Sequence, residues 1–217
     1  MELNMTQEQT KKSLSGNPNL VQNCFYEQPQ NPLHLLTNWI KTAEKIGVRE
    51  PRSFTLSTVD PDGKPWCRIL LLKDEDDKGI CFSTGATSRK GRELTQNNYC
   101  AGNLWWRETM QQISFSGPAR PLSNDISDKL FYHRTREAQA VAAISEQSSA
   151  LPDKQALNKK VEALVVSNQI ILRPKNWHAY FMKIEEIEFW LGNTNRVHQR
   201  LHYMLLDKEW SHQWLQP

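Results

Sequence analysis

Residues 53–72 read SFTLSTVDPDGKPWCRILLL, and this stretch decides the fold class. Residues 53–59 alternate apolar and polar side chains and are rich in strand formers, which predicts a half-buried β-strand. The segment Asp60-Pro61-Asp62-Gly63-Lys64 is typical of a turn, because proline sets φ and glycine accepts a positive φ. Residues 66–72 then return as a second strand. The stretch therefore predicts an antiparallel β-hairpin.

The rest of the chain continues this pattern of neighbouring strands. Further strands are expected at residues 80–84, 101–106, 112–119, 178–184, 186–191, 201–206 and 210–215, and an acidic turn at 74–79. Helices are expected at 32–46, 88–97, 124–134, 136–145 and 153–166, the first of them starting at Asn31-Pro32. Strands and helices do not alternate, which excludes a doubly wound parallel sheet. We expect a mainly β fold, an antiparallel closed or nearly closed barrel with helices packed outside it.

Composition narrows the class of protein further. The chain has 217 residues and a formal net charge of +3, which is too balanced to indicate nucleic-acid binding. No run approaches the roughly 18 apolar residues of a membrane span. The first residues form no apolar signal segment, so we expect a cytoplasmic protein. The four cysteines are widely spaced and form no CxxC pair, so no metal site is expected.

The N-terminal segment differs in composition from the rest. Residues 1–30 are rich in Gln, Asn, Ser and Lys and are expected to form a flexible arm. Residues 31–217 are expected to form a single domain.

A candidate anion site lies at Thr87-Ser88-Arg89-Lys90-Gly91, before a short helix. Ser88 can cap that helix, whose free N–H groups and dipole favour an anion. Arg89 and Lys90 add two positive charges, so a phosphate monoester would suit this site. A capped surface helix with a basic first turn is the alternative interpretation.

The strand Arg68-Ile69-Leu70-Leu71-Leu72-Lys73 carries a cation on each face, because alternate side chains of a strand point to opposite sides. A buried barrel wall that serves an anionic ligand would have this pattern, and so would two charges at fraying strand ends. Weaker signals are the amide of Gln112, beside apolar strand positions, and the polar segment Glu146-Gln147-Ser148-Ser149 after an Ala-rich helix.

A third basic segment follows Trp190, whose ring offers a stacking surface. On an extended chain, Arg196, His198 and Arg200 would share one face. Three potential cations repel one another unless an anion or a carboxylate lies among them. His198 could also exchange a proton near neutral pH. This pattern favours a functional anion site over a solvated edge.

Taken together, these segments resemble a known family. The ordered set RILLLK, ST…SRK, QQ, EQSS, EFW, RVHQR and LQP runs from about Asn31 to Pro217. It is similar to the FMN-dependent pyridoxamine/pyridoxine 5′-phosphate oxidase family, which has a dimeric, FMN-binding split β-barrel. Within that family the chain looks most like the phenazine-biosynthesis branch, the PhzG type, through VREP at 48–51, SRKGREL at 88–94 and WRETMQQI at 106–113.

The resemblance implies a homodimer with FMN at the subunit interface, and it implies a role for each matching residue. The cofactor-binding residues would be Arg68, Ile69, Leu70, Leu71, Ser83, Thr84, Ser88, Arg89, Lys90, Gln112, Gln147, Ser148, Trp190 and Arg200. Of these, Arg68, Ser88, Arg89 and Lys90 would hold the phosphate, and Gln147, Ser148, Trp190 and Arg200 would come from the partner subunit. Lys73, Arg134, Arg196 and His198 would face the substrate, with Arg196 and His198 as the catalytic pair.

The chain differs from the pyridoxamine/pyridoxine 5′-phosphate oxidases, called here the vitamin oxidases, at the positions that bind the phosphate of their substrate. Those enzymes use a Tyr and a Ser besides an Arg; this chain keeps Arg134 but has Leu130 and Ala138 at the other two positions. An alignment shifted by one residue would bring Tyr132 into question. Losing two hydroxyl donors favours a larger, flatter and more apolar substrate. Lys73, in contrast, is a feature shared with the vitamin oxidases.

These observations predict an FMN-dependent oxidase of phenazine biosynthesis. Its substrate would be a small aromatic carboxylate, a reduced phenazine precursor, and O2 would be reduced to hydrogen peroxide. One alternative is a pyridoxine/pyridoxamine 5′-phosphate oxidase that makes pyridoxal 5′-phosphate. The other is a flavin-binding split-barrel protein without catalytic turnover. Neither nucleic acid nor a membrane is expected as a partner.

Overall fold

The structure, a computed structural model, describes residues 16–17, 20, 25 and 28–217. The expected flexible arm at residues 1–30 lies for the most part outside the described residues and stays a prediction. The chain forms two compact units that alternate along the sequence, residues 1–54, 102–116 and 185–217 in unit 1 and residues 55–101 and 117–184 in unit 2. Strands β5 (Tyr99–Trp106) and β6 (Gln111–Pro121) contribute one half to each unit. The single domain expected over 31–217 remains a prediction.

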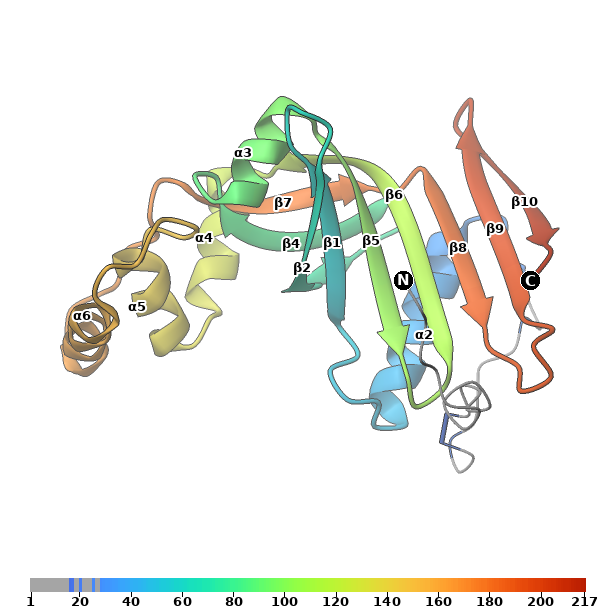
Figure 1. Ribbon diagram of the computed structural model, residues 1–217, viewed down its shortest axis with the longest axis horizontal. Coiled ribbons are helices and arrows are strands. Elements are labelled where there is room, and N and C mark those ends of the chain that lie inside the picture. The colour runs from blue at the N-terminus through green and yellow to red at the C-terminus, as the bar shows by residue number, and fades with distance from the viewer. Residues whose placement is uncertain (1–15, 18–19, 21–24, 26–27) are drawn as a thin grey trace, which may run out of the picture. The chain divides into compact units, whose positions relative to one another are not determined.

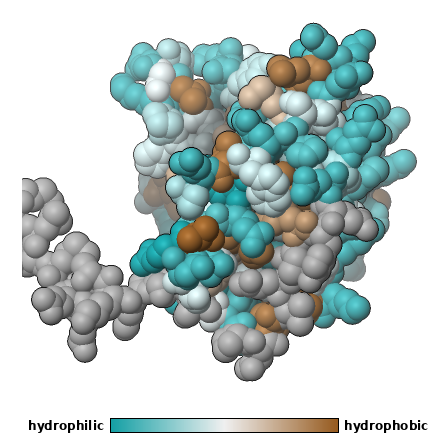
Figure 2. All heavy atoms as spheres, turned by 90° about the vertical axis from the view of Figure 1, so that its right-hand side faces the viewer, coloured by the Kyte–Doolittle hydropathy of each residue, from teal (hydrophilic) through white to brown (hydrophobic). Residues whose placement is uncertain are grey.

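In its described residues, unit 1 consists of an antiparallel sheet and helix α2. Its strands are hydrogen-bonded in the order β10-β9-β8-β6-β5, with β8 at Glu186–Leu191, β9 at Gln199–Leu206 and β10 at Glu209–Leu215. Helix α2 (Pro32–Lys45) begins as expected, because the Asn31 side chain accepts a hydrogen bond from Leu33 N at 2.9 Å. Trp39 of α2 packs against Phe189 of β8, with ring centroids 5.2 Å apart. Seen from the β9–β10 side, the surface is mainly hydrophilic and its exposed apolar residues lie in small separate patches (Figure 2).

Unit 2 contains the predicted hairpin, formed by β1 (Ser53–Val59) and β2 (Pro65–Leu71). Strand β4 (Gly79–Gly85) pairs antiparallel with β7 (Trp177–Lys183) and with the short β3 (Asp74–Glu75), which occupies part of the expected acidic turn. Helix α3 (Arg89–Gln96) follows β4. Helices α4 (Asn124–Tyr132), α5 (Arg136–Ile144) and α6 (Lys154–Val166) lie together near one end of β4 and β7 (Figure 1). A core of Phe131, Ala140, Ile171 and Trp177 joins them to β7.

Strand β2 is an edge strand in the single chain, where it does not form the buried wall that was one of the two interpretations of this segment. It ends the strand order β5-β1-β2, so nothing pairs with its outer edge in the described chain. Trp66, Ile69 and Leu71 are 53%, 72% and 46% exposed. Because side chains alternate along a strand, these exposed residues lie on both faces of β2. Lys73 lies beyond the end of the strand.

One arginine connects helices α5 and α6. The Arg136 guanidinium donates to Leu164 O at 3.1 Å, Val165 O at 2.7 Å and Gln169 O at 3.0 Å, and also to Ser167 O. These carbonyls belong to the end of α6 and the loop after it, where a helix leaves its last C=O groups without partners. Arg136 therefore ties the start of α5 to the end of α6.

We expect Arg136→Met to lower the free energy of unfolding by about 1.5–3 kcal/mol, the contribution of hydrogen bonds to a charged donor. Urea denaturation followed by circular dichroism measures the change. Lys160→Met, on the exposed side of α6, is the matched control and should change the stability by less than about 0.5 kcal/mol. Equal effects of the two substitutions would contradict the role given to Arg136.

Among the described residues, no helix combines the length and the apolar character needed to cross a bilayer.

Candidate functional site

The segment from Ser88 to Gly91 forms a tight polar corner where β4 leads into α3. The Ser88 hydroxyl donates to Gly85 O at 2.7 Å and accepts from Gly91 N at 3.3 Å, so Ser88 is the N-cap of α3. A Cβ on Gly91 would come within 2.4 Å of Gly85 O, so only glycine allows this close approach. The predicted cap is confirmed.

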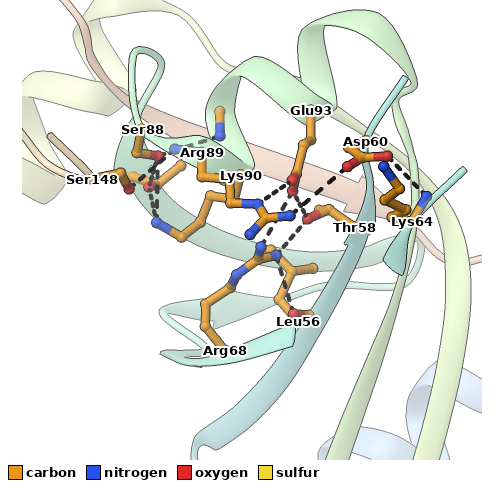
Figure 3. Close-up of polar contacts among 12 residues, drawn as sticks. Leu56, Thr58, Asp60, Lys64, Arg68, Ser88, Arg89, Lys90, Glu93 and Ser148 are labelled. Atoms are coloured by element: carbon orange, nitrogen blue, oxygen red, sulfur yellow. Dashed lines mark hydrogen bonds and ion pairs between the residues drawn. The ribbon is translucent and has the colours of Figure 1, made fainter. Parts of the chain in front are cut away.

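Lys90 points into this corner and is 5% exposed. Its Nζ donates to Thr84 Oγ1 at 3.2 Å and Ser88 Oγ at 3.4 Å, and within the described part of the chain it forms no ion pair (Figure 3). Burial and the charge of Arg68, partly opposed by Glu93, lower the pKa of Lys90 to about 8. A buried cation with only hydroxyl partners is suited to receive an anion.

Glu93 is the residue of this site that the sequence analysis missed. Its side chain is 5% exposed and accepts hydrogen bonds from Arg89 Nε at 2.8 Å, from Arg68 Nη2 at 3.3 Å and from the Thr58 hydroxyl (Figure 3). Burial alone would raise the pKa of this carboxyl, but the bonds from Thr58, Arg89 and Arg68 outweigh it and hold the pKa below its usual range. The spacing of Arg89 and Glu93, four residues apart on one helix face, is the signal that could have found it.

The two arginines expected at the phosphate are therefore already bound to a carboxylate, unlike Lys90. Arg68 Nη1 also donates to Thr58 Oγ1 at 2.5 Å and to Leu56 O at 3.3 Å. The Arg89 guanidinium lies 4.3 Å from the centroid of the Trp66 ring and 3.9 Å from Asp60 Oδ2. Glu93 thus holds both side chains in place beside the corner formed by Ser88 and Lys90.

Gln147 and Ser148, on the loop after α5, join the same corner from the same chain. The Ser148 hydroxyl accepts from Arg89 N at 3.1 Å (Figure 3). Gln147 Oε1 accepts from Thr84 Oγ1 at 3.3 Å. The resemblance implied that both residues come from the partner subunit. Within the single chain, the loop after α5 turns back onto the start of α3 and brings both residues to this corner. The contribution from the partner subunit stays a prediction.

A pocket of about 520 Å³ lies beside this corner. Ser83, Thr84 and Gln147 supply polar groups to its lining, and Leu70 and Leu71 of β2 line it as well; Ile69, expected at the cofactor, does not line the pocket and is 72% exposed. The remaining lining residues are Lys73, Gly85, Thr87, His133, Arg134, Thr135, Ala138, Val141, Ala142, Ser145, Asn176 and Trp177. The wall formed by α5 is made of small apolar side chains.

Two cations meet in this pocket. Burial, followed by repulsion from Arg134, lowers the pKa of Lys73, and burial lowers the pKa of Arg134. The Arg134 guanidinium lies 5.2 Å from the centroid of the Trp177 ring. Neither cation forms an ion pair with any residue that the structure describes, so the pair is suited to an anionic group of a ligand. Ala138 lines the pocket, whereas Leu130 packs against the Phe131 core and Tyr132 is exposed.

The other predicted residues lie in unit 1. Gln112 on β6 pairs with Trp190 on β8, and Trp190 pairs with Arg200 on β9, so the three form a row across adjacent strands. Arg200 binds both carboxylate oxygens of Glu188, at 2.7 and 3.0 Å, which supplies the carboxylate expected among the cations. Gln111 points to the other face and is buried.

The expected common face of Arg196, His198 and Arg200 is wrong. Residues 193–198 form a turn and not an extended strand, with Arg196 at φ 69°, and β9 begins only at Gln199. Of the three, only Arg200 lies on the strand. The His198 ring lies 4.6 Å from the Trp190 ring.

Comparison with known proteins assigns this arrangement to a family. The sequence model of "Pyridoxamine 5′-phosphate oxidase" matches residues 40–167, and that of the "Pyridoxine 5′-phosphate oxidase C-terminal dimerisation region" matches residues 177–217. The chain belongs to the pyridoxamine 5′-phosphate oxidase family.

Members of two kinds are similar to this chain. A "Dihydrophenazinedicarboxylate synthase" of Burkholderia lata is 37% identical over 206 residues, which cover 95% of this chain and 97% of the relative. A "Pyridoxine/pyridoxamine 5′-phosphate oxidase" of Chromohalobacter salexigens is 36% identical over 193 residues, 87% of this chain and 90% of the relative. The crystal structure of PhzG from Burkholderia lata, in complex with tetrahydrophenazine-1-carboxylic acid, matches with a TM-score of 0.88 over 92% of this chain and all of that chain. The predicted fold class, a mainly β split barrel with flanking helices, is confirmed.

The geometry of the site itself suits the phosphate of a flavin, the cofactor that the resemblance to the pyridoxamine 5′-phosphate oxidase family implies. Lys90 is a buried cation without an ion pair, and it lies beside the capped N-terminus of α3. The pocket next to it is lined by both polar groups and leucines, which suits a flat ring system with a polar edge. No cluster of His, Cys, Asp and Glu suited to a metal occurs among the described residues.

Proposed function

We propose that this protein is an FMN-dependent oxidase of phenazine biosynthesis, which oxidises a reduced phenazine carboxylate with O2 as the acceptor. The observation that carries the proposal is the pocket in which Lys73 and Arg134 meet without a carboxylate, against an apolar wall on α5. A flat aromatic acid matches both features, because its carboxylate pairs with the cations and its rings cover Ala138, Val141 and Ala142. The similarity to dihydrophenazinedicarboxylate synthases supports the same class of substrate.

In this proposal the cofactor is held by residues from two copies of the chain. Lys90, Ser88 and the N–H groups of α3 bind the phosphate, with Arg68 and Arg89 beside them, and Ser83, Thr84, Leu70 and Leu71 lie along the flavin. The row of Gln112, Trp190 and Arg200 is contributed by the second copy of a homodimer, as the match to the dimerisation region supports. FMN supplies the redox chemistry when bound, by accepting two electrons from the reduced substrate and passing them to O2. Lys73, Arg134, Arg196 and His198 bind and orient the substrate.

The second candidate is a pyridoxine/pyridoxamine 5′-phosphate oxidase. The pair of Lys73 and Arg134 favours it, because two cations suit a phosphate as well as a carboxylate. The side chains of Ala138, Val141 and Ala142 offer no hydroxyl donor to that phosphate. A flavin-binding protein without turnover remains as the candidate of another class.

Hydrogen peroxide production in air by the FMN-loaded protein separates these candidates. We expect peroxide with a freshly reduced phenazine carboxylate, above its rate of oxidation without protein, and little with pyridoxine 5′-phosphate. Efficient turnover of pyridoxine 5′-phosphate would overturn the proposal in favour of the vitamin oxidase. A protein that binds FMN but turns over neither substrate would support the non-catalytic candidate.

The affinity for FMN is expected to fall as the pH rises above about 8, the pKa of Lys90 in the FMN-free protein. A bound phosphate favours the charged form of Lys90 and raises its pKa, so binding above this pH requires uptake of a proton. The dissociation constant should increase by up to about tenfold per pH unit until the pKa of the bound state is reached. Flavin fluorescence titrations from pH 6 to 10 measure this, and Lys90→Arg, which stays charged, should give a flat profile above pH 8. A flat profile for the unsubstituted protein would contradict the assignment.

A further inference from the structure

The chain between α4 and α5 brings three consecutive residues to the pocket, His133, Arg134 and Thr135, called here the 133–135 turn. Hydrogen bonds of its backbone hold this turn in place. His133 N donates to Lys129 O at 3.1 Å, at the end of α4, and the Gln139 side chain of α5 donates to Arg134 O at 2.9 Å. Both helices therefore fix the path of the turn along the pocket.

His133 adds a third basic side chain to this pocket. Lys73, His133 and Arg134 are the charged or titratable residues of its lining, and no carboxylate of the described residues lines it. His133 is exposed, and its imidazole forms no hydrogen bond or ion pair with any residue that the structure describes. Its exposure and its place in the lining put the ring at the rim of the pocket. A lining with this balance of charge is suited to a ligand with an anionic group.

We propose that His133 is a further substrate-binding residue, whose imidazolium form pairs with the anionic group that Lys73 and Arg134 receive. Histidine is the side chain whose charge ordinarily changes between about pH 5 and 8. The pairing contributes to binding at the acidic end of this range, and it is lost as the ring gives up its proton at the basic end. The inference rests on the proposed function for the ligand, a flat aromatic acid.

The other charged groups near the 133–135 turn were compared with the lining of the pocket. Strands β4 and β7 contribute only uncharged residues to it. The charged residues of α4 and α5 do not line the pocket; they are Asp125, Asp128, Lys129, Arg136 and Glu137. Lys73 can also take up a proton when an anion binds, since burial, followed by repulsion from Arg134, lowers its pKa. A substitution of His133 alone separates the two contributions.

The test is calorimetric titration of the FMN-loaded protein with phenazine-1-carboxylate at pH 6 and at pH 8.5. We expect His133→Gln to weaken binding roughly two- to fivefold at pH 6, the factor of an exposed ion pair, and to leave it unchanged at pH 8.5. His133→Lys stays charged at both pH values and should bind more tightly than the unsubstituted protein at pH 8.5. His34→Gln, on an exposed position of α2, is the matched control and should change binding at neither pH.

Phenazine, which has the same rings and no carboxylate, is the control ligand. Its binding should be the same in all variants at both pH values. Equal weakening of phenazine and phenazine-1-carboxylate in His133→Gln would overturn the inference, because the loss would not depend on the anionic group. A loss that is the same at pH 6 and at pH 8.5 would overturn it as well, because a neutral ring would then serve equally.

A second pair of probes separates this inference from the proposed function. 4-Deoxypyridoxine 5′-phosphate and 4-deoxypyridoxine match the substrate of a vitamin oxidase with and without its anionic group, and both lack the hydroxyl that would be oxidised. If phenazine-1-carboxylate binds without any dependence on His133, the inference fails and the proposed function stands. If only 4-deoxypyridoxine 5′-phosphate binds, and His133→Gln weakens it at pH 6 alone, the phenazine proposal fails and the role of His133 stands. If neither anionic probe binds, both fail.

Discussion

Lys90→Met is expected to weaken FMN binding by roughly 10- to 150-fold, the factor that corresponds to about 1.5–3 kcal/mol for a hydrogen bond between charged groups. Lys90 is the cation of the α3 corner that has no carboxylate among the described residues, and its Nζ is held by two hydroxyls that can turn toward a ligand. Methionine has a similar length and fills the same buried space, so the loss reports on the charge. Fluorescence titration with FMN measures it.

Riboflavin is the control ligand, because it has the same ring system and no phosphate. Its affinity should be the same in Lys90→Met and in the unsubstituted protein. The FMN-free variant should also be at least as stable at pH 7, since a buried cation without an ion pair opposes folding. Equal losses for FMN and riboflavin would show that Lys90 supports the pocket in general and does not bind the phosphate.

Glu93→Leu is expected to lower the free energy of unfolding by about 3 kcal/mol. Breaking a buried ion pair costs about 3–5 kcal/mol because it leaves an uncompensated charge. Here Arg68, with a side chain 16% exposed, loses its carboxylate, while Arg89 is 39% exposed and can turn to solvent, which places the effect at the lower end. Guanidinium denaturation of the FMN-free protein measures the change.

Glu44→Leu is the matched control. Glu44 pairs with Arg52 at 2.5 Å, but the two side chains are 39% and 32% exposed. Surface pairs contribute about 0–1 kcal/mol, so this substitution should have a small effect. An effect as large as that of Glu93→Leu would mean that burial does not distinguish the two pairs.

The Glu93 contribution should also depend on pH. Its pKa is lower in the folded protein than in the unfolded chain, so the stabilisation is present above the usual range of a glutamate and is lost as the pH falls. The difference in stability between the unsubstituted protein and Glu93→Leu should therefore shrink on acidification.

The local elements of this protein follow from local sequence. Asn31-Pro32 starts a helix, Gly63 and its neighbours make the turn of the hairpin, and Ser88 caps α3, each through interactions within a few residues. Local sequence did not predict the burial of strand β2. Its apolar run with a cation on each face allowed either a buried wall or charges at strand ends. Burial depends on what packs against a strand, and in the single chain β2 is an edge.

In the candidate site, too, some features follow from local sequence and others depend on the tertiary structure. Arg68, Arg89 and Lys90 could be identified from their types and spacing, but not which of them is free to meet a phosphate. That depends on Glu93, which reaches Arg68 and Thr58 only because α3 and β1 are brought together by the fold. Gln147 and Ser148 likewise reach Thr84 and Arg89 across about 60 residues of sequence, through the path of the loop after α5.

The sequence by itself thus determined the antiparallel β class, the capped corner at Ser88, the family, and Arg68, Arg89 and Lys90 as the basic residues near that corner. Only the tertiary structure decided that Glu93 binds two of these three cations and that Lys90 has no carboxylate partner in the described chain. It also decided that Gln112, Trp190 and Arg200 form one row. The physical reason is that caps and turns depend on neighbours in sequence, whereas ion pairing and burial depend on groups that strand register and loop conformation bring together.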